Sequence, residues 1–261
     1  MSVTDYSVLT KKRPEKSLIL KLKSHAGRDR TGQISVRHQG GGEKKQYRII
    51  SNLNEIMDTS AIIESIEYDP YRSSFIALVK FDGKIKKYIL AWEGAKVKDE
   101  IISADKTEIK IGNRLKLKNI PNGIRIFDIE IKPTQGGKMV RSAGAFATIV
   151  AKEEKFVNLK MPSDEIRKIN AECFASVGQV SNITHSAQRI GKAGRKRHMG
   201  IRPSVRGKAM HPAAHPHGGG EGNNPIGLKY PKTPWGKHAL GVRTRKKNKY
   251  SKSMIISRRK K

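Results

Sequence analysis

Acidic residues are almost missing from the last part of this sequence. Residues 190–261 carry twenty Lys and Arg against a single carboxylate side chain, Glu221, whereas residues 49–189 carry twenty-two against eighteen. The first 48 residues are again basic, with twelve against four, and the whole 261-residue chain has a net charge of +31. The Debye length is roughly 8 Å at physiological ionic strength, so neighbouring cations in both ends repel one another unless a polyanion neutralises them. This distribution favours nucleic acid as the partner, ahead of an anionic membrane.

Cysteine and long apolar runs are scarce as well. The single Cys173 excludes a disulfide framework and a multi-cysteine zinc site, and it is typical of a small buried side chain in a reducing compartment. No segment approaches the ~20 apolar residues of a membrane-spanning helix, and the tail has no amphipathic run with a broad apolar face. No secretory signal precedes the first basic residues. We therefore expect no membrane partner.

Proline and glycine interrupt the most basic stretch, residues 190–222. Pro203, Pro212 and Pro216 exclude a helix over most of it, and they argue equally against a central strand. Such an irregular path is usually disordered unless something outside the chain satisfies its backbone groups and its charge. The alternative is a flexible basic linker. Six cations indicate that the missing partner is an anion: Arg195, Lys196, Arg197, Arg202, Arg206 and Lys208.

The N-terminal part repeats this character. Residues 1–24 lack clear periodicity and are interpreted as an extended basic arm. Residues 25–48 combine several cations with Gly40-Gly41-Gly42, a run that lets backbone N–H groups approach a phosphate closely. No Gly-Lys-Ser/Thr closes the run, so a nucleotide-binding P-loop is not supported.

From about residue 49 to residue 180 the pattern is one of short strands. We expect strands over 62–68, 75–81 and 85–90, with a hairpin turn at Asp82-Gly83, and a second hairpin in which Ile109 and Ile111 pair with Leu115 and Leu117. The apolar phase slips near Ile126-Phe127, which indicates a bulge or a strand covered on both faces. Further strands are expected over 145–150, 156–161, 165–169 and 175–180, and a turn of helix over 186–190. Scattered charges such as Arg72 and Lys132 are expected on solvated faces.

Short strands at this spacing favour closed or sandwiched all-β folds. We predict an all-β chain with two consecutive small barrels. The boundaries are an arm over 1–24, a first barrel with a basic, glycine-rich entry over 25–118, a second barrel over 119–190, and a basic extension over 191–261. Small barrels often bind nucleic acid, which by itself is an analogy at the level of fold.

Three histidines form the one cluster that resembles a catalytic or metal site. His211 and His215 have the i,i+4 spacing of a helical zinc pair, but Pro212 and Pro216 forbid the helix. With His217, they are expected to stack on RNA or hydrogen-bond to it, with metal binding and general acid–base chemistry as alternatives. Trp235, in the tail, has two open interpretations, a core side chain or a platform for a base.

The stretch VRGKAMHPAAHPHGGGEG resembles the signature of the large-subunit ribosomal protein of the universal L two family. Other matching landmarks follow in the family's order: PEKSL at 14–18, TGQISVRHQGGG at 31–42, EYDPYRSSFIALV at 67–79, NIPNG at 119–123, RSAG at 141–144, GKAGR at 191–195 and TPWG at 233–236. The resemblance implies an oligonucleotide-binding-type barrel followed by an SH3-like barrel. It also implies extensions that enter ribosomal RNA near the peptidyl-transferase region and help to hold the subunits together.

Four departures from the family pattern bear on function. The N-terminal arm is short, Glu43 stands where the pattern commonly has His, and His198-Met199 replace a common Trp-Arg pair. His211 and Ala214 replace a common Asn and Asp beside His215, which weakens any charge relay through that histidine. RNA positioning would be unaffected.

The sequence thus predicts a structural ribosomal protein and not an enzyme. Expected partners are large-subunit rRNA, other ribosomal proteins and the small subunit, with no small-molecule substrate, no metal site and no cofactor beyond Mg²⁺ held through the RNA. The expected location is a cytoplasmic ribosome of bacterial type, with an organellar ribosome as the alternative. Rival functions are a hydrolase or metalloenzyme built on the three histidines with Glu221, and a DNA-compacting protein. The predicted RNA-binding residues are Arg28, Arg37, His38, Gly40, Gly41, Gly42, Lys44, Arg48, Arg141, Lys192, Arg195, Arg197, Arg202, Arg206, His215, His217, Gly218, Gly219, Gly220, Trp235, Arg243 and Arg245.

Overall fold

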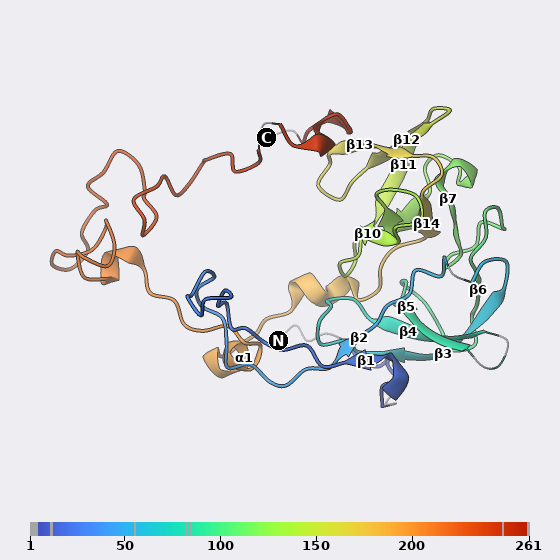
Figure 1. Ribbon diagram of the computed structural model, residues 1–261, viewed down its shortest axis with the longest axis horizontal. Helices are drawn as coiled ribbons and strands as arrows, with labels where there is room; N and C mark the ends of the chain where they lie inside the picture. Colours follow the sequence, from blue (N-terminus) through green and yellow to red (C-terminus); the bar gives the residue numbers. More distant parts are fainter. Residues whose placement is uncertain are drawn as a thin grey trace. The chain divides into compact units, whose positions relative to one another are not determined.

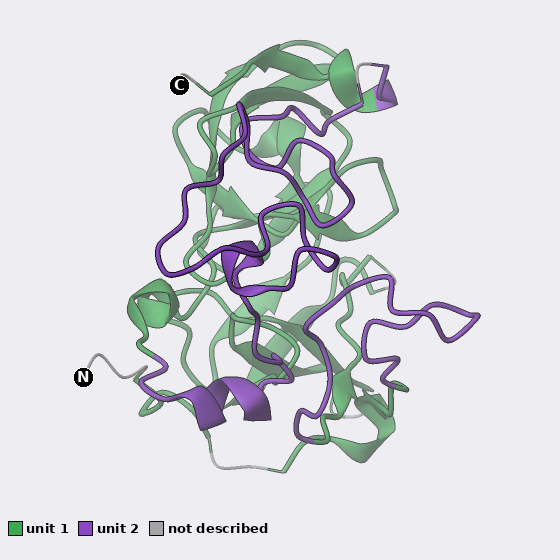
Figure 2. Ribbon diagram, turned by 90° about the vertical axis from the view of Figure 1, so that its left-hand side faces the viewer, with its two compact units in different colours: residues 1–23, 44–189, 251–261 green, residues 24–43, 190–250 purple. Residues whose placement is uncertain are grey.

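The computed structural model describes residues 5–10, 13–54, 56–81, 83, 85–246 and 248–259. They form two compact units, each built from separate pieces of chain (Figure 2). We call residues 1–23, 44–189 and 251–261 the β unit, and residues 24–43 and 190–250 the basic unit. Of the predicted Asp82-Gly83 turn, Asp82 lies outside the described residues.

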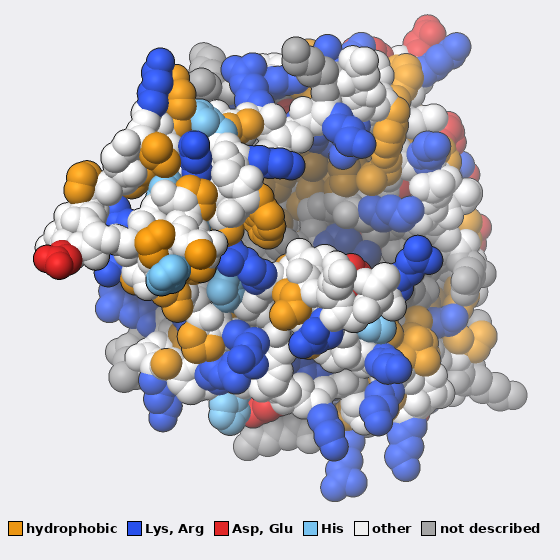
Figure 3. Space-filling model, turned by 60° about the vertical axis from the view of Figure 1, so that its left-hand side comes forward, with side chains coloured by type: hydrophobic (Ala, Val, Ile, Leu, Met, Phe, Trp, Pro, Cys, Tyr) orange, Lys and Arg blue, Asp and Glu red, His pale blue; other side chains and the backbone are white. Residues whose placement is uncertain are grey.

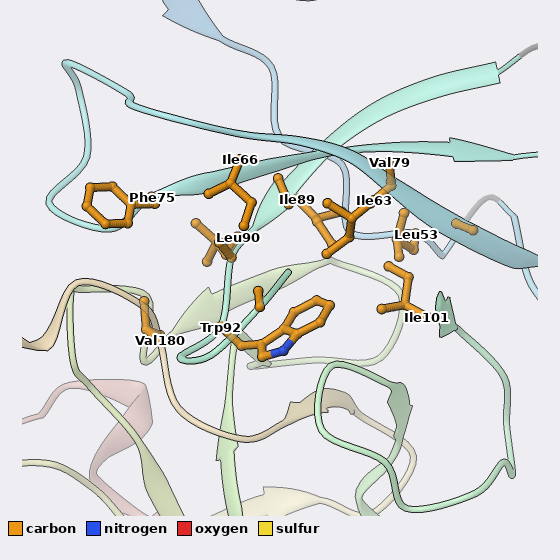
Figure 4. Packing of buried hydrophobic residues seen from close by; sticks show 14 of the residues in the cluster. Leu53, Ile63, Ile66, Phe75, Val79, Ile89, Leu90, Trp92, Ile101 and Val180 are labelled. Carbon is orange, nitrogen blue, oxygen red and sulfur yellow. The ribbon is translucent and has the colours of Figure 1, made fainter. Parts of the chain in front are cut away.

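One antiparallel sheet of the β unit has the strand order β5-β4-β3-β6 (Figure 1). Its strands are β3 (Ser60–Glu67), β4 (Ile76–Phe81), β5 (Ile85–Leu90) and β6 (Glu100–Ile102). The first three confirm the strands predicted over 62–68, 75–81 and 85–90. Apolar side chains such as Ile63, Val79 and Ile101 pack beneath the sheet with Trp92 (Figure 4). The expulsion of these side chains from water is the main stabilising contribution to this half of the β unit.

The larger sheet has the order β15-β13-β12-β11-β8-β14-β7. Its strands are β7 (Arg114–Lys116), β8 (Arg125–Phe127), β11 (Ala147–Lys152), β12 (Phe156–Lys160), β13 (Ile166–Asn170), β14 (Phe174–Val177) and β15 (Ile255–Ser257). It encloses a second core that includes Leu115, Ile126, Leu159 and Cys173. Burial raises the pKa of the Cys173 thiol to about 12, which keeps it protonated. The predicted all-β class is confirmed.

The predicted phase slip corresponds to a break in the chain direction. Strand β8 ends at Phe127, and β9 (Ile129–Glu130) begins after Asp128, whose φ is +48°. β9 then pairs with β10 (Gly137–Met139) in a separate two-stranded sheet. The change of face in the apolar pattern therefore marks a change of sheet.

One predicted strand is wrong. Ile109 and Ile111 are exposed and lie in no strand, and Leu117 begins a 3₁₀-helix, η2 (Leu117–Asn119). β7 pairs with β14 of the larger sheet, so the change from one main sheet to the other falls between Ile102 and Arg114. The predicted barrel boundary was placed later, between 118 and 119.

Segments near both ends of the chain pair with strands of the β unit, although they were predicted to be irregular extensions. After a 3₁₀-helix, η1 (Lys16–Leu18), strand β1 (Ile19–Leu20) pairs with β2 (Tyr47–Arg48), and the Thr10 N–H donates to the Ile66 carbonyl oxygen over 2.9 Å. At the other end β15 pairs with β13. Residues 24–43, which were predicted to belong to the first barrel, instead form a compact unit with 190–250.

The basic unit follows the irregular path that its prolines and glycines predict. Its regular elements are α1 (Ala193–His198) and the 3₁₀-helix η4 (Gly207–Ala209), and a further 3₁₀-helix, η5 (Tyr250–Lys252), begins at its last residue. The predicted turn of helix near 186–190 occurs slightly earlier, as the 3₁₀-helix η3 (Ile183–Ala187) of the β unit. Within the described ranges, none of the helices is long and apolar enough to cross a membrane.

Candidate RNA interface

The basic unit is compact without an apolar core. Its sequence contains eighteen Lys and Arg against three Asp and Glu. Among its described residues only His215 is buried. Lys and Arg spread over the molecular face shown in Figure 3, where Asp and Glu are few. The unit therefore relies on backbone hydrogen bonds and close glycine contacts rather than on hydrophobic burial.

Backbone hydrogen bonds clamp residues 38–43 to residues 198–203. The N–H of Gly40 donates to the Gly200 carbonyl oxygen (2.9 Å), that of Glu43 to the His198 carbonyl oxygen (2.9 Å), and that of Arg202 to the His38 carbonyl oxygen (3.0 Å). A side chain on Gly42 would place its Cβ 2.8 Å from the Cα of Gly200, so only glycine permits this approach. The predicted Gly40–Gly42 run is thus placed against the chain itself.

Side chains reinforce the clamp. The Glu43 carboxylate lies 2.5 Å from Nδ1 of His198, so the acid that stood out in the sequence has an intramolecular partner. The guanidinium of Arg197 lies against Gly41, where an added Cβ would be 3.3 Å from Nη2. Nη1 of Arg197 is buried and has no hydrogen-bond acceptor among the described residues.

His215 is the centre of the loop that contains the predicted histidine cluster. The residue is 7% exposed, and an added Cβ on Gly207 would lie 2.6 Å from its ring. Its Nδ1 accepts a hydrogen bond from the His217 backbone N–H (3.0 Å), so the neutral ring carries its proton on Nε2. This arrangement gives His215 a packing role inside the loop. Its direct contact with RNA stays a prediction.

His217 is fixed in a similar way. Its Nε2 accepts a hydrogen bond from the Lys232 backbone N–H (2.9 Å), and its ring centroid lies 4.8 Å from that of His215. Burial, followed by the nearby His215, Lys208 and Lys232, lowers the pKa of His217. The lowered pKa favours the neutral imidazole, and in that form the hydrogen bond to Nε2 places the ring proton on Nδ1.

The glycines after the histidines serve the loop itself. The Gly218 N–H donates to the His215 carbonyl oxygen (2.8 Å), and the Gly219 N–H donates to the Met210 carbonyl oxygen (3.1 Å). Side chains on Gly218 and Gly219 would collide with the His211 carbonyl oxygen and with Pro212. The space left by their missing side chains is thus filled by the loop itself, and contact of these glycines with RNA stays a prediction.

Trp235 lies at the tip of a tight turn. The Gly236 N–H donates to the Thr233 carbonyl oxygen (2.9 Å), and Thr233 and Lys237 exchange further hydrogen bonds. Trp235 is 71% exposed, and the Arg37 guanidinium carbon lies 5.4 Å from its ring centroid. This exposure rules out the interpretation of Trp235 as a core side chain.

Three predicted residues belong to the β unit. Arg141 is half-buried: its Nε lies 3.1 Å from Asp128 Oδ1, and its Nη1 donates to the Gly137 carbonyl oxygen (2.7 Å). Arg48 is also half-buried, whereas Lys44 is exposed. All the other predicted residues lie in the basic unit. Exposed among them are Arg28, Arg37, His38, Lys192, Arg195, Arg202, Arg206, Arg243 and Arg245.

Arg72, which was expected on a solvated face, has specific partners in the structure. Arg72 pairs with the fully buried Asp69, donates to the Tyr47 hydroxyl (3.0 Å), and lies 5.0 Å from the Tyr47 ring centroid. The expectation for Arg72 was therefore wrong, while Lys132 is exposed as expected. The i,i+3 spacing of Asp69 and Arg72 was a signal of the pairing.

The β unit contains a buried ionic network that the sequence did not predict. Arg114 is 2% exposed, and its Nη1 donates to the backbone oxygen (2.9 Å) and to Oδ2 (3.2 Å) of Asp128 and to the Ser176 hydroxyl (3.3 Å). Its Nη2 lies 3.8 Å from a carboxylate oxygen of Glu130. Burial lowers the pKa of Arg114, while the two acids oppose that shift. Because Asp128 also pairs with Arg141, this network sets the position of a predicted RNA-binding residue.

Among the described residues, no group of three or more His, Cys, Asp and Glu is arranged to hold a metal ion. The three histidines of residues 211–217 have backbone N–H groups as their ring partners. The ring nitrogens that accept these hydrogen bonds are not free to bind a metal.

Two family models match the chain. Ribosomal Proteins L2, RNA binding N-terminal domain, matches residues 15–103, and Ribosomal Proteins L2, C-terminal domain, matches residues 110–236. Together they cover most of the chain, and the gap between them coincides with the change from one main sheet to the other. The chain belongs to the ribosomal protein L2 family, and it is therefore a structural, rRNA-binding constituent of the large ribosomal subunit and not an enzyme.

Proposed function

We propose that this ribosomal protein binds rRNA early in large-subunit assembly and orders the RNA around the peptidyl-transferase centre. Through that order it supports association with the small subunit and tRNA binding. The proposed location is a cytoplasmic ribosome of bacterial type. Mg²⁺ at the interface would be held by RNA phosphates.

The observation that carries this proposal is the basic unit. Its pieces, 24–43 and 190–250, are far apart in sequence and meet without an apolar core, under a large excess of positive charge. Burial of apolar area normally offsets the conformational entropy that such a unit loses on ordering, about 1–2 kcal/mol per residue for the backbone. Here that contribution is small, so neutralisation of the charge by RNA phosphates would add to the backbone hydrogen bonds that stabilise the unit.

Reconstitution of large subunits from rRNA and purified proteins tests the proposal. Particles that lack this chain should sediment slowly and fail to join small subunits. A chain in which Lys192, Arg195, Arg202 and Arg206 are all replaced by Gln should give the same defect in weaker form. A chain with Lys106→Gln, a change of an exposed lysine in the β unit, serves as the matched control. Normal sedimentation and subunit joining without the chain would refute the assembly role.

A further inference from the structure

The basic unit contains a cleft of about 430 Å³ beside the glycine run. It lies within the range of roughly 300–1,000 Å³ that is typical of small-ligand sites. Among the described residues that line it there is no Asp or Glu, so no lining carboxylate would repel an anion bound there. The cleft lies wholly in the basic unit and is separate from the histidine loop.

One part of the cleft is apolar. Ile34 and Val36 line it with Ala26, and both larger side chains are more than half exposed to solvent. Backbone interactions within residues 27–36 hold them in place. The Val36 N–H donates to the Gly27 carbonyl oxygen (3.0 Å), and the backbones of Arg28 and Ile34 form an isolated antiparallel β-bridge. Exposed β-branched side chains in so basic a segment offer a surface on which a flat, uncharged group can pack.

Three guanidinium groups line the rest. Arg28 is held in position by donating from Nη1 to the Gly32 carbonyl oxygen (2.8 Å), and Arg37 lies over Trp235. Arg202 has no side-chain partner among the described residues. His38 donates from Nδ1 to the Pro203 carbonyl oxygen (3.0 Å) when neutral, which leaves Nε2 as a hydrogen-bond acceptor.

We propose that this cleft binds one unpaired rRNA nucleotide, with the base on Ile34 and Val36 and the phosphate on the guanidinium groups. The inference rests on the proposed rRNA binding and names the form of RNA that this site takes. A duplex is too wide for the cleft, whereas a splayed nucleotide presents a flat base and an adjacent phosphate together. Arg202, which lacks a side-chain partner, is the main phosphate contact.

The test is chemical probing of 2′-hydroxyl reactivity on large-subunit rRNA, combined with affinity measured over a range of salt concentrations. The wild-type chain should protect a short unpaired stretch. The double variant Ile34→Ser/Val36→Ser should lose that protection, keep the rest of the footprint, and bind about tenfold more weakly at an unchanged salt slope. The conservative double variant Ile34→Val/Val36→Ile keeps the apolar surface and should protect the same stretch as the wild-type chain. Arg202→Gln should reduce the salt slope by roughly 0.7, the value for one single-strand phosphate contact.

Val97→Ser and Lys106→Gln, two changes of exposed β-unit residues, serve as controls and should leave footprint and slope intact. A wild-type footprint and affinity for Ile34→Ser/Val36→Ser would overturn the inference. If a nucleoside monophosphate at millimolar concentration removes the local protection alone, the cleft is a site for free nucleotides and the RNA assignment is wrong. If the wild-type chain itself leaves no footprint, the proposed function fails before this inference is reached.

Discussion

Replacement of His215 distinguishes a packing role from a chemical one. Its Nδ1 accepts the N–H of the residue two positions later, as an Asn side chain does in an Asx turn. His215→Asn therefore keeps the acceptor and loses only the rest of the ring. His215→Leu fills a similar space but leaves the His217 N–H without its partner.

The structure predicts the order of the two effects. An unsatisfied buried donor costs about 1–3 kcal/mol, and the half-buried position of His217 puts His215→Leu at the lower end. Because 1.4 kcal/mol corresponds to a factor of ten, His215→Leu should weaken rRNA binding about five- to tenfold. His215→Asn should weaken it less.

The assay is single-turnover peptide-bond formation on reconstituted subunits whose sedimentation is normal. Both variants should react within tenfold of wild type, a loss of at most ~1.4 kcal/mol in transition-state stabilisation. A loss of a thousandfold or more for both, in normally assembled subunits, would show that the imidazole takes part in the chemistry. The packing role would then be refuted.

Three further predictions concern stability and binding. Arg114→Met should lower the free energy of unfolding of the β unit by about 3–5 kcal/mol, because two carboxylates lose their buried cation; urea denaturation measures this. The lowered pKa of His217 means that the unfolded loop binds more protons than the folded loop, so the loop should lose stability as pH falls below 6.5. The rate of limited proteolysis of the loop around residues 211–217 measures that change. His217→Gln, which keeps an acceptor for the Lys232 N–H, should reduce the pH dependence of this rate. Gly42→Ala should weaken rRNA binding, because overpacking at the clamp costs about 1–3 kcal/mol; filter binding measures this.

Each of these predictions has a contrary outcome. A change within 0.5 kcal/mol for Arg114→Met, similar to that expected for the surface control Lys106→Gln, would show that the buried network adds little to stability. Cleavage of the His217 loop that does not vary between pH 5 and pH 8 would contradict the assigned protonation state. Wild-type affinity for Gly42→Ala would mean that the clamp does not organise the RNA-binding surface.

Alternation of apolar and polar residues was enough to predict most of the β unit. β3, β4, β5, β12 and β13 lie within a few residues of their predicted bounds, because each keeps one face in a core. Ile109 and Ile111 also alternate with charged residues, but both are exposed. Periodicity alone cannot tell whether a partner strand exists to cover the apolar face.

The charge map and the proline pattern predicted the irregular basic path of residues 190–250, but not that residues 24–43 join it in one unit or how that unit is held together. The clamp at Gly42 depends on the approach of Gly200, which is remote in sequence. The pairing of β15 with β13 and the burial of Arg114 likewise depend on residues brought together only by folding. Local sequence carries no signal for such contacts. Trp235 illustrates the same limit, because its exposure follows from a turn that the sequence allowed but did not require.

The salt dependence of rRNA binding tests the central claim, that the basic unit binds rRNA through phosphate contacts, most directly. The logarithm of the affinity of the full chain should fall linearly and steeply with the logarithm of salt concentration. Replacement of Lys192, Arg195, Arg202 and Arg206 by Gln should reduce the slope by roughly 0.7 to 0.9 for each phosphate that the variant no longer neutralises, while Lys106→Gln leaves it unchanged. A slope near zero for the wild-type chain, or an equal slope for the fourfold variant, would contradict that claim.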